Sequence, residues 1–400
     1  MTQNFGLFSV LCAYNSKPIV FVCTFQLLKT NHMKKSLLFA VLISVLTISC
    51  ENTPSETDDD VVIDNANDSI TTSFVFVGCN RLWWKDLARN NSSANTDALK
   101  NIFQHVAASS TKTDYFFFLG DIVSGEATND VLEGQLKAWN EDYDNGVFSD
   151  FKSSGITMIP IPGNHEMLNQ SETPLAGTTD TWMKYMGKYM PTDRDSVPNS
   201  PVDRMTYGFT DGNIGFIVLN TDTYNTDDEI GVESQIPYNW VKQQVEKYNS
   251  DPAIEHIFVM GHRPFYVQCE RDTTHRGMCD PAQSSPVWQS FEDNDVASML
   301  SAHVHQYQRM QPNQKTYQLI AGNGGSPAHH HTPPAFFGYT RINIYASGRI
   351  EMLSEGYDAP TPYFDVVKSP NWSVRDSLFD MNWYKQGAKN EKDCKCVVGE

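Results

Sequence analysis

Four short apolar runs each lead to a glycine, and the next residue after each glycine is polar or able to bind metal. The runs are 74–77, 115–119, 158–161 and 257–260, and the residues after the glycines are Cys79, Asp121, Asn164 and His262. Apolar runs of this length are typical of buried strands. Because ligands bind at the carboxyl ends of strands in open α/β sheets, we expect these polar side chains to gather at one edge.

Helical and strand patterns fill the rest of the chain. Apolar residues recur at helical spacing in 99–106, 132–143 and 241–248, and further strands are predicted at 216–219 and 317–321. The segments 341–345 and 349–353 predict a hairpin around Ser347-Gly348. Strands alternate with helices in the first half and dominate the second. This order predicts an α/β fold with at least a partly parallel sheet.

Charge limits the classes of partner. The chain has 400 residues with 48 acidic and 30 basic side chains, a net charge of -18. Nucleic-acid binding needs basic patches, so no nucleic-acid-binding surface is expected. An anionic membrane surface is an equally poor partner for the folded domain itself. A small phosphorylated substrate remains compatible, because bound metal ions reverse the local field.

The N-terminal region resembles an export signal rather than a folded domain. Residues 1–32 are interpreted as a spurious upstream extension, and 33–50 as a signal peptide similar to bacterial lipoprotein signals. A basic start at Met33 leads into the apolar run 36–48 and then to Cys50, the expected lipidation site. An uncleaved signal anchor is the alternative. We expect an exported lipoprotein, periplasmic or at the cell surface, that contacts the membrane through its lipid anchor only.

Two further segments flank the expected domain, 71–358. Residues 51–70 are acidic and poor in apolar side chains, which predicts a disordered tether. Residues 359–400 show little pattern and are interpreted as a peripheral C-terminal extension. Within the domain, Cys269 and Cys279 lie ten residues apart in a polar stretch. In an oxidising compartment they are expected to form a loop disulfide.

The residues at the strand ends include good ligands for transition metals. They combine a carboxylate, an amide oxygen and imidazoles: Asp121, Asn164, His262, His303 and His305. This mixture suits Zn, Fe or Mn. Each residue taken alone has a plainer explanation, since Gly-Asp is common in turns and a single histidine is usually structural.

The order of these blocks resembles the calcineurin-like metallophosphoesterases, including the purple acid phosphatase branch. The matching blocks are Gly-Asp at 120–121, Gly-Asn-His-Glu at 163–166, Gly-His at 261–262 and Ala-His-Val-His at 302–305. The strand that ends in Asn220-Thr221-Asp222 also looks like part of the family pattern. The resemblance covers roughly 74–355. It implies a four-layer α/β/β/α sandwich of two mixed sheets and hydrolysis of a phosphomonoester or phosphodiester with one or two metal ions.

The resemblance also implies a role for each matched residue. Asp121 would bridge two ions, and Asn164, His262 and His303 would complete what we call the second site. His305 would bind the ion of the first site. His165 would act on the substrate as general acid or phosphate-binding cation. Glu166 would orient a ligand from behind.

The first block departs from the family pattern. Cys79 stands where the family has aspartate, Arg81 where it has a second ligand, and Ser124 where the purple branch has tyrosine. Cys79 is either a thiolate ligand or a small buried residue. Arg81 is either a catalytic group that binds phosphate or an exposed arginine at a loop start.

Residues beside the blocks are candidates for substrate binding, and the altered first block leaves two functions open. The candidates are Arg263, His275, Tyr307 and Arg309. The first hypothesis is a metal-dependent phosphoric ester hydrolase that acts on a phosphorylated small molecule or ester. The alternative is a catalytically impaired surface protein that binds metal and phosphate.

The export interpretation predicts that Cys50 carries lipid. Labelled fatty acid should be incorporated into the chain in cells, and Cys50→Ala should abolish both the label and membrane association, because the lipid on Cys50 is the expected anchor. Membrane association that survives this substitution would contradict the interpretation.

Overall fold

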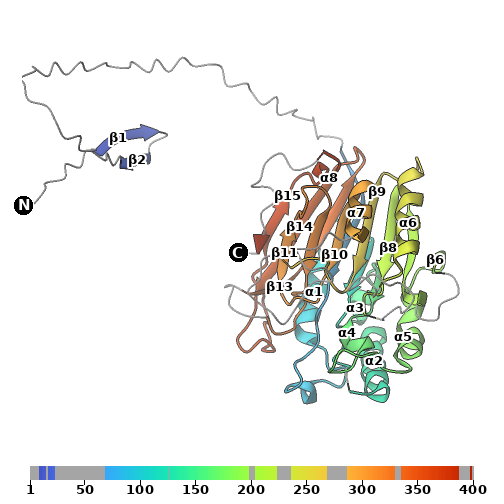
Figure 1. Ribbon diagram of the computed structural model, residues 1–400. Helices are drawn as coiled ribbons and strands as arrows, with labels where there is room; N and C mark the ends of the chain where they lie inside the picture. Colours follow the sequence, from blue (N-terminus) through green and yellow to red (C-terminus); the bar gives the residue numbers. More distant parts are fainter. Residues whose placement is uncertain are drawn as a thin grey trace, which may run out of the picture. The chain divides into compact units, whose positions relative to one another are not determined.

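The computed structural model describes residues 68–125, 127–197, 203–222, 236–267, 286–328 and 335–386, together with the backbone of three short strands outside them. The chain divides into two units, Met1–Ile63 and Asp64–Glu400. In the first unit, β1 (Ser9–Tyr14) pairs antiparallel with β2 (Lys17–Val22). The second unit holds every other element (Figure 1). Among the described residues, no helix combines the length and apolar character needed to cross a membrane.

One sheet of the second unit has six strands in the order β15-β14-β13-β3-β4-β5. Their bounds are β3 (Ile70–Val77), β4 (Tyr115–Leu119), β5 (Thr157–Ile161), β13 (Phe336–Tyr345), β14 (Ile350–Asp358) and β15 (Ser373–Leu378). Strands β3, β4 and β5 run parallel, and the remaining pairs are antiparallel. The carboxyl ends of β3, β4 and β5 therefore lie at one edge.

The other sheet has eight strands in the order β16-β11-β12-β10-β9-β8-β7-β6. Their bounds are β6 (Asp195–Ser196), β7 (Tyr207–Asp211), β8 (Ile214–Leu219), β9 (His256–Gly261), β10 (Val296–Ser301), β11 (Tyr307–Met310), β12 (Tyr317–Ala321) and β16 (Val397–Val398). Strands β8, β9, β10 and β12 are parallel neighbours. This sheet also presents a row of parallel strand ends.

Helices cover the outer faces of both sheets. Side chains of α1 (Thr96–Ala107), α2 (Asn129–Asp144) and α5 (Thr178–Met186) share an apolar cluster with the six-stranded sheet. Helices α6 (Tyr238–Ser250) and α7 (Pro286–Asp293) share another with the eight-stranded sheet, beside β8 to β10 in Figure 1. The short helices are α3 (Ser149–Lys152), α4 (Asn164–Met167), α8 (Trp383–Gln386), η2 (Leu87–Arg89), η3 (Gly187–Tyr189) and η4 (Asp203–Met205).

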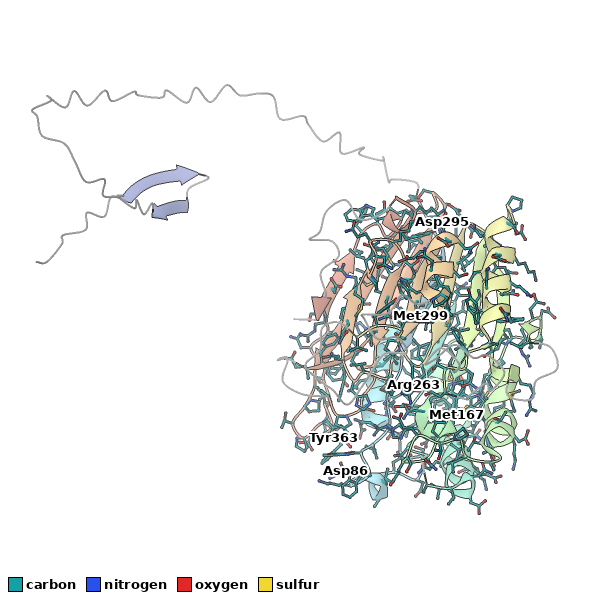
Figure 2. All side chains as sticks on the ribbon, in the orientation of Figure 1. Asp86, Met167, Arg263, Asp295, Met299 and Tyr363 are labelled. Carbon is teal, nitrogen blue, oxygen red and sulfur yellow. The ribbon has the colours of Figure 1, made fainter. Side chains whose placement is uncertain are left out.

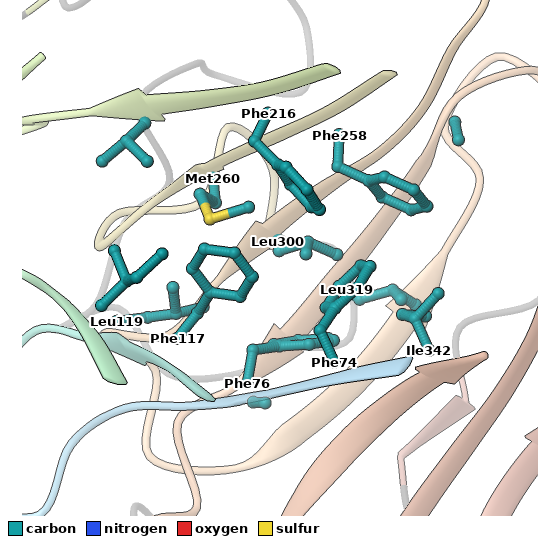
Figure 3. Close-up of a cluster of buried hydrophobic side chains, with 14 of the residues drawn as sticks. Phe74, Phe76, Phe117, Leu119, Phe216, Phe258, Met260, Leu300, Leu319 and Ile342 are labelled. Atoms are coloured by element: carbon teal, nitrogen blue, oxygen red, sulfur yellow. The ribbon is translucent and has the colours of Figure 1, made fainter. Parts of the chain in front are cut away.

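A third apolar cluster fills the space between the sheets (Figure 3). Phe74 of β3 makes edge-to-face contacts with Phe117, Phe216 and Phe258, with ring centroids 5.1–5.6 Å apart. Aromatic pairs of this geometry add to the stabilisation from area burial. Because these rings come from both sheets, they set how one sheet lies on the other. The predicted four-layer α/β/β/α sandwich is confirmed.

The C-terminal segment is part of this sandwich, which corrects the expectation of a peripheral extension from residue 359. Strand β15 pairs with β14, and Met381 and Tyr384 are buried in the cluster between the sheets. Asp376 of β15 accepts hydrogen bonds from Tyr307 (2.6 Å) and from Arg309 Nε (2.7 Å) on β11. This clasp of Asp376 with Tyr307 and Arg309 joins the edge strand β15 of the six-stranded sheet to β11 of the eight-stranded sheet. Residues 359–386 show little pattern, so the sequence did not indicate that this segment packs in the sandwich.

This ion pair yields a stability prediction. Asp376→Ala should lower the free energy of unfolding by about 3 kcal/mol, because it leaves the buried Arg309 charge without its partner. Urea unfolding followed by circular dichroism measures the change. The matched control is Asp358→Ala, which removes a carboxylate that is 75% exposed from Arg375 and should cost under about 1 kcal/mol. Equal effects of the two substitutions would show that the Asp376 clasp is no more buried than the Arg375–Asp358 pair.

Candidate metal centre

The predicted ligands come from the strand ends of both sheets. Asp121 follows β4 and Asn164 begins α4 after β5, whereas His262 follows β9 and His303 follows β10. Figure 2 shows Arg263 and Met167, which adjoin these blocks, in one half of the domain, and Asp295, just before β10, at the opposite end. The two rows of parallel strand ends therefore meet at a single place.

The backbone at this place is held in an uncommon conformation. Cys79, Asp121 and His303 have positive φ angles of 60°, 54° and 63°. Such left-handed residues cost free energy outside glycine and cluster at functional sites. Gly120, with φ 83°, cannot be replaced, because a Cβ there would lie 2.5 Å from His262 Nδ1.

Four side-chain atoms of the second site converge on a common point. His262 Nε2 lies 3.2 Å from Asp121 Oδ1 and 3.0 Å from Asn164 Oδ1. His303 Nδ1 lies 3.1 Å from Asn164 Oδ1 and 3.2 Å from His262 Nε2. Spacings near 3 Å are those of atoms that share one small cation, whose ligand bonds measure about 2.0–2.2 Å.

Neighbouring carbonyl groups fix the histidine tautomers in a form that suits metal binding. His262 Nδ1 lies 2.7 Å from the Leu119 carbonyl oxygen and donates to it, so Nε2 carries the lone pair. Asp121 Oδ1 and Asn164 Oδ1 are acceptors as well. With a neutral His262, the four atoms share at most one proton, on His303 Nδ1. A cation resolves this crowding of acceptors, and the donor set fits Zn, Fe or Mn.

Asp121 and Glu166 are two buried carboxylates with different surroundings. Burial opposes ionisation of Asp121, but the nearby His262, His165 and Arg81 lower its pKa to about 2. Glu166 has its pKa raised by burial and by the charge of Asp121, while three backbone N–H groups oppose that rise. These donors belong to Asp121, Val123 and Gly163. Glu166 thus links the backbone of two ligand blocks through these three hydrogen bonds.

His165 lies beside the second site without joining it. Its backbone N–H donates to Asp121 Oδ1 (3.3 Å), and its ring Nδ1 donates to the Ser124 carbonyl oxygen (2.8 Å). Burial and the positive charge of Arg81 lower the pKa of His165 to about 3. The imidazole is therefore neutral at neutral pH in the resting protein. Its ring is oriented by Ser124, a residue whose role the sequence did not indicate.

The first site contains fewer donors. Ligand atoms of Cys79, Asp121 and His305 lie within 4.8 Å of one another. His305 Nδ1 donates to the Pro327 carbonyl oxygen (2.8 Å), which leaves the lone pair on Nε2. Burial and the charge of Asp121 raise the pKa of Cys79, so this side chain is a neutral thiol unless a cation binds it. Arg81 Nε lies 3.6 Å from Asp121 Oδ2.

The predicted substrate-binding residues have different surroundings. Arg263 reaches the site, with Nη1 3.4 Å from His303 Nε2, and Asp222 accepts from its Nε (2.5 Å). Asp222 belongs to the Asn220-Thr221-Asp222 stretch that resembles the family pattern, and this resemblance was the signal that could have identified it. Tyr307 and Arg309 bind Asp376 in the clasp described above, which corrects their assignment to a substrate cleft. His275, the Cys269–Cys279 pair and Cys50 lie outside the described residues.

Solved structures with similarity to the chain include a purple acid phosphatase, PhoD and GAP50. The chain is 15% identical to a purple acid phosphatase from yellow lupin (Lupinus luteus) seeds, with a TM-score of 0.49. The match covers 78% of the present chain and 53% of the lupin chain. It thus spans about half of the lupin enzyme. PhoD is 16% identical with a TM-score of 0.49, and the match covers 78% of the present chain and 71% of PhoD. GAP50 of Plasmodium is 13% identical with a TM-score of 0.48, and the match covers 77% of the present chain and 90% of GAP50.

Among curated proteins no match is found. The family model described as calcineurin-like phosphoesterase matches residues 61–307, well over half of the chain. This range contains all the ligand blocks from Cys79 to His305. The family predicted from the order of those blocks is therefore confirmed: the chain belongs to the calcineurin-like phosphoesterase family.

Proposed function

We propose that this protein hydrolyses a phosphomonoester or phosphodiester with the help of metal bound at the second site. The observation that carries the proposal is the convergence of Asp121, Asn164, His262 and His303, whose ligand atoms lie 3.0–3.2 Å from their neighbours. A cation bound between these atoms would satisfy all of them at once, since each offers a lone pair in its ordinary metal-binding form. Such an ion supplies positive charge for the phosphoryl oxygens and favours ionisation of the attacking water.

The chain's own residues surround this ion with complementary functions. In the reaction the water oxygen bonds to phosphorus, the ester P–O bond breaks, and the leaving oxygen takes up a proton while the water loses one. His165 transfers the proton through its Nε2 atom, because its other ring nitrogen, Nδ1, is bonded to the Ser124 carbonyl oxygen. Arg81 and Arg263 offer guanidinium groups to the phosphate oxygens. Glu166 keeps Asp121 and the 163–166 block in register.

The proposed setting is outside the cytoplasm. The apolar run 36–48 followed by Cys50 supports export and attachment to a membrane by lipid alone. A net charge of -18 suits a domain held near a membrane without adhering to its anionic surface. A phosphorylated small molecule or ester is the proposed substrate class.

The second candidate function is binding of metal and phosphate without turnover. The altered first site favours it, because Cys79 is fully buried and Arg81 lies beside the carboxylate that would bridge two ions. Turnover on a panel of aryl phosphate monoesters and diesters decides between the candidates. Hydrolysis supports the enzyme, and tight binding of inorganic phosphate without hydrolysis supports the binding protein.

The metal proposal predicts a joint loss of metal and activity. Asn164→Ala or His303→Ala should lower bound metal to below about a tenth of the unmodified level and abolish hydrolysis, because each removes one of four ligands. Elemental analysis of the purified chain measures the first effect. His105→Ala is the matched control, since His105 bonds Tyr339 on another part of the fold and should retain metal. Full metal content in the Asn164 variant would contradict the assignment.

The role of His165 predicts a different outcome. His165→Ala should cut kcat by about 10²–10⁴-fold and leave the metal content unchanged, because this side chain acts on the substrate and not on the ion. Steady-state kinetics and elemental analysis of the same preparation test both parts. Loss of metal in this variant would show that His165 is a ligand and would overturn the division of roles.

A further inference from the structure

Arg81 occupies a fixed position next to the first site. Its backbone N–H donates to the Asp121 carbonyl oxygen (3.1 Å), and its own carbonyl accepts from Ser326 Oγ (2.9 Å). Arg81 also forms an isolated β-bridge with Ala94. These contacts direct the side chain toward Asp121, and only 12% of it is exposed. The guanidinium is therefore part of the site and not a surface group.

The two oxygens of Asp121 have different partners. Oδ1 faces His262 Nε2 at 3.2 Å and belongs to the second site. Oδ2 faces Arg81 Nε at 3.6 Å, on the side where a bridging carboxylate would meet another ion. Arg81 Nε makes no hydrogen bond to the described part of the chain. One half of the carboxylate thus serves a metal site, and the other already has a permanent cation.

The donor sets of the two sites are unequal. The second site has four ligand residues, all of types that bind metal in their ordinary protonation states. The first site has Asp121 in common with it and adds His305 and Cys79, whose thiol is fully buried. A divalent ion at the first site would also lie close to the Arg81 guanidinium. Two positive charges close together repel strongly where water is excluded. The chain's residues therefore fit one ion well and a second ion poorly.

We propose that the Arg81 guanidinium takes the place of the first metal ion, so that the protein works with one ion per chain and binds a phosphate oxygen through Arg81. The inference deepens the proposed function and rests on it. Arginine suits the role because its planar fork binds phosphate in a bidentate manner and stays charged at every relevant pH. A fixed cation supplies charge to the phosphate but does not activate water, so that task stays with the second site.

Metal stoichiometry of the full chain tests the first half of the proposal. The protein is stripped of metal, incubated separately with excess Mn²⁺, Zn²⁺ or Fe²⁺, freed of unbound ions and analysed. We expect about one ion per chain. Two ions per chain, with a sulfur ligand in the X-ray absorption spectrum, would overturn the inference and leave the proposed function standing. No bound ion under any condition would overturn the proposed function itself, so the two failures are distinguishable.

Phosphate binding tests the second half. Arg81→Gln should weaken binding of inorganic phosphate to the metal-loaded protein by about 10–100-fold, the range expected for a charge-assisted contact, while metal stays near one per chain. Titration calorimetry measures the affinity. Arg89→Gln, which removes a half-exposed arginine of the same loop, is the matched control and should bind phosphate normally. Unchanged affinity in the Arg81 variant would overturn the proposal.

Restoring the family ligands gives the converse test. The double variant Cys79→Asp with Arg81→His should raise metal content from about one toward two ions per chain, because a carboxylate and an imidazole replace a thiol and a cation. Circular dichroism confirms that the variant folds. A folded double variant that still holds a single ion would count against Arg81 as the excluding group. If the variant does not fold, the stoichiometry of the unmodified chain decides the question.

Discussion

The carboxylate of Asp121 is the constraint on which the site depends. It is buried, it lies on a residue with a left-handed backbone, and it meets groups from both sheets. Its Oδ1 faces His262 from the eight-stranded sheet, and its Oδ2 faces Arg81 from the six-stranded one. A buried negative charge is stable only with cations or donors around it. The buried charge of Asp121 is therefore stable only while its neighbours keep this arrangement.

The packing between the sheets provides that arrangement. Ligands from two separate sheets meet within about 3 Å only when the sheets are locked in one relative position. The Phe74 cluster supplies the lock in the interior, and the clasp of Asp376 with Tyr307 and Arg309 supplies it at one edge. Core packing tolerates little displacement, since protein interiors are close-packed. The distant C-terminal strand β15 is thereby tied to the geometry of the metal centre.

Local patterns in the sequence located most of the parallel strands and the ligand blocks. The expected strands at 115–119 and 317–321 coincide with β4 and β12, because short runs made up mostly of apolar residues indicate buried strands well. Strand β10, Val-Ala-Ser-Met-Leu-Ser, was missed, since two serines interrupt its apolar character. The Ser298 and Ser301 hydroxyls donate to carbonyl oxygens of β12, a solution that only the neighbouring strand makes visible.

The sequence by itself determined the family, the order of the ligand blocks and the departure at Cys79 and Arg81, because these depend on residue type and spacing along the chain. Only the tertiary structure decided which side chains share a point in space. It withdrew Tyr307 and Arg309 from the site, brought Asp222 to Arg263, and set Arg81 against Asp121 Oδ2. The physical reason is that such contacts join strands from different parts of the chain. The distances of Asp376 to Tyr307 and Arg309 follow from how two sheets pack, and the other two distances follow from which strands are neighbours within a sheet. No local pattern in the sequence records either arrangement.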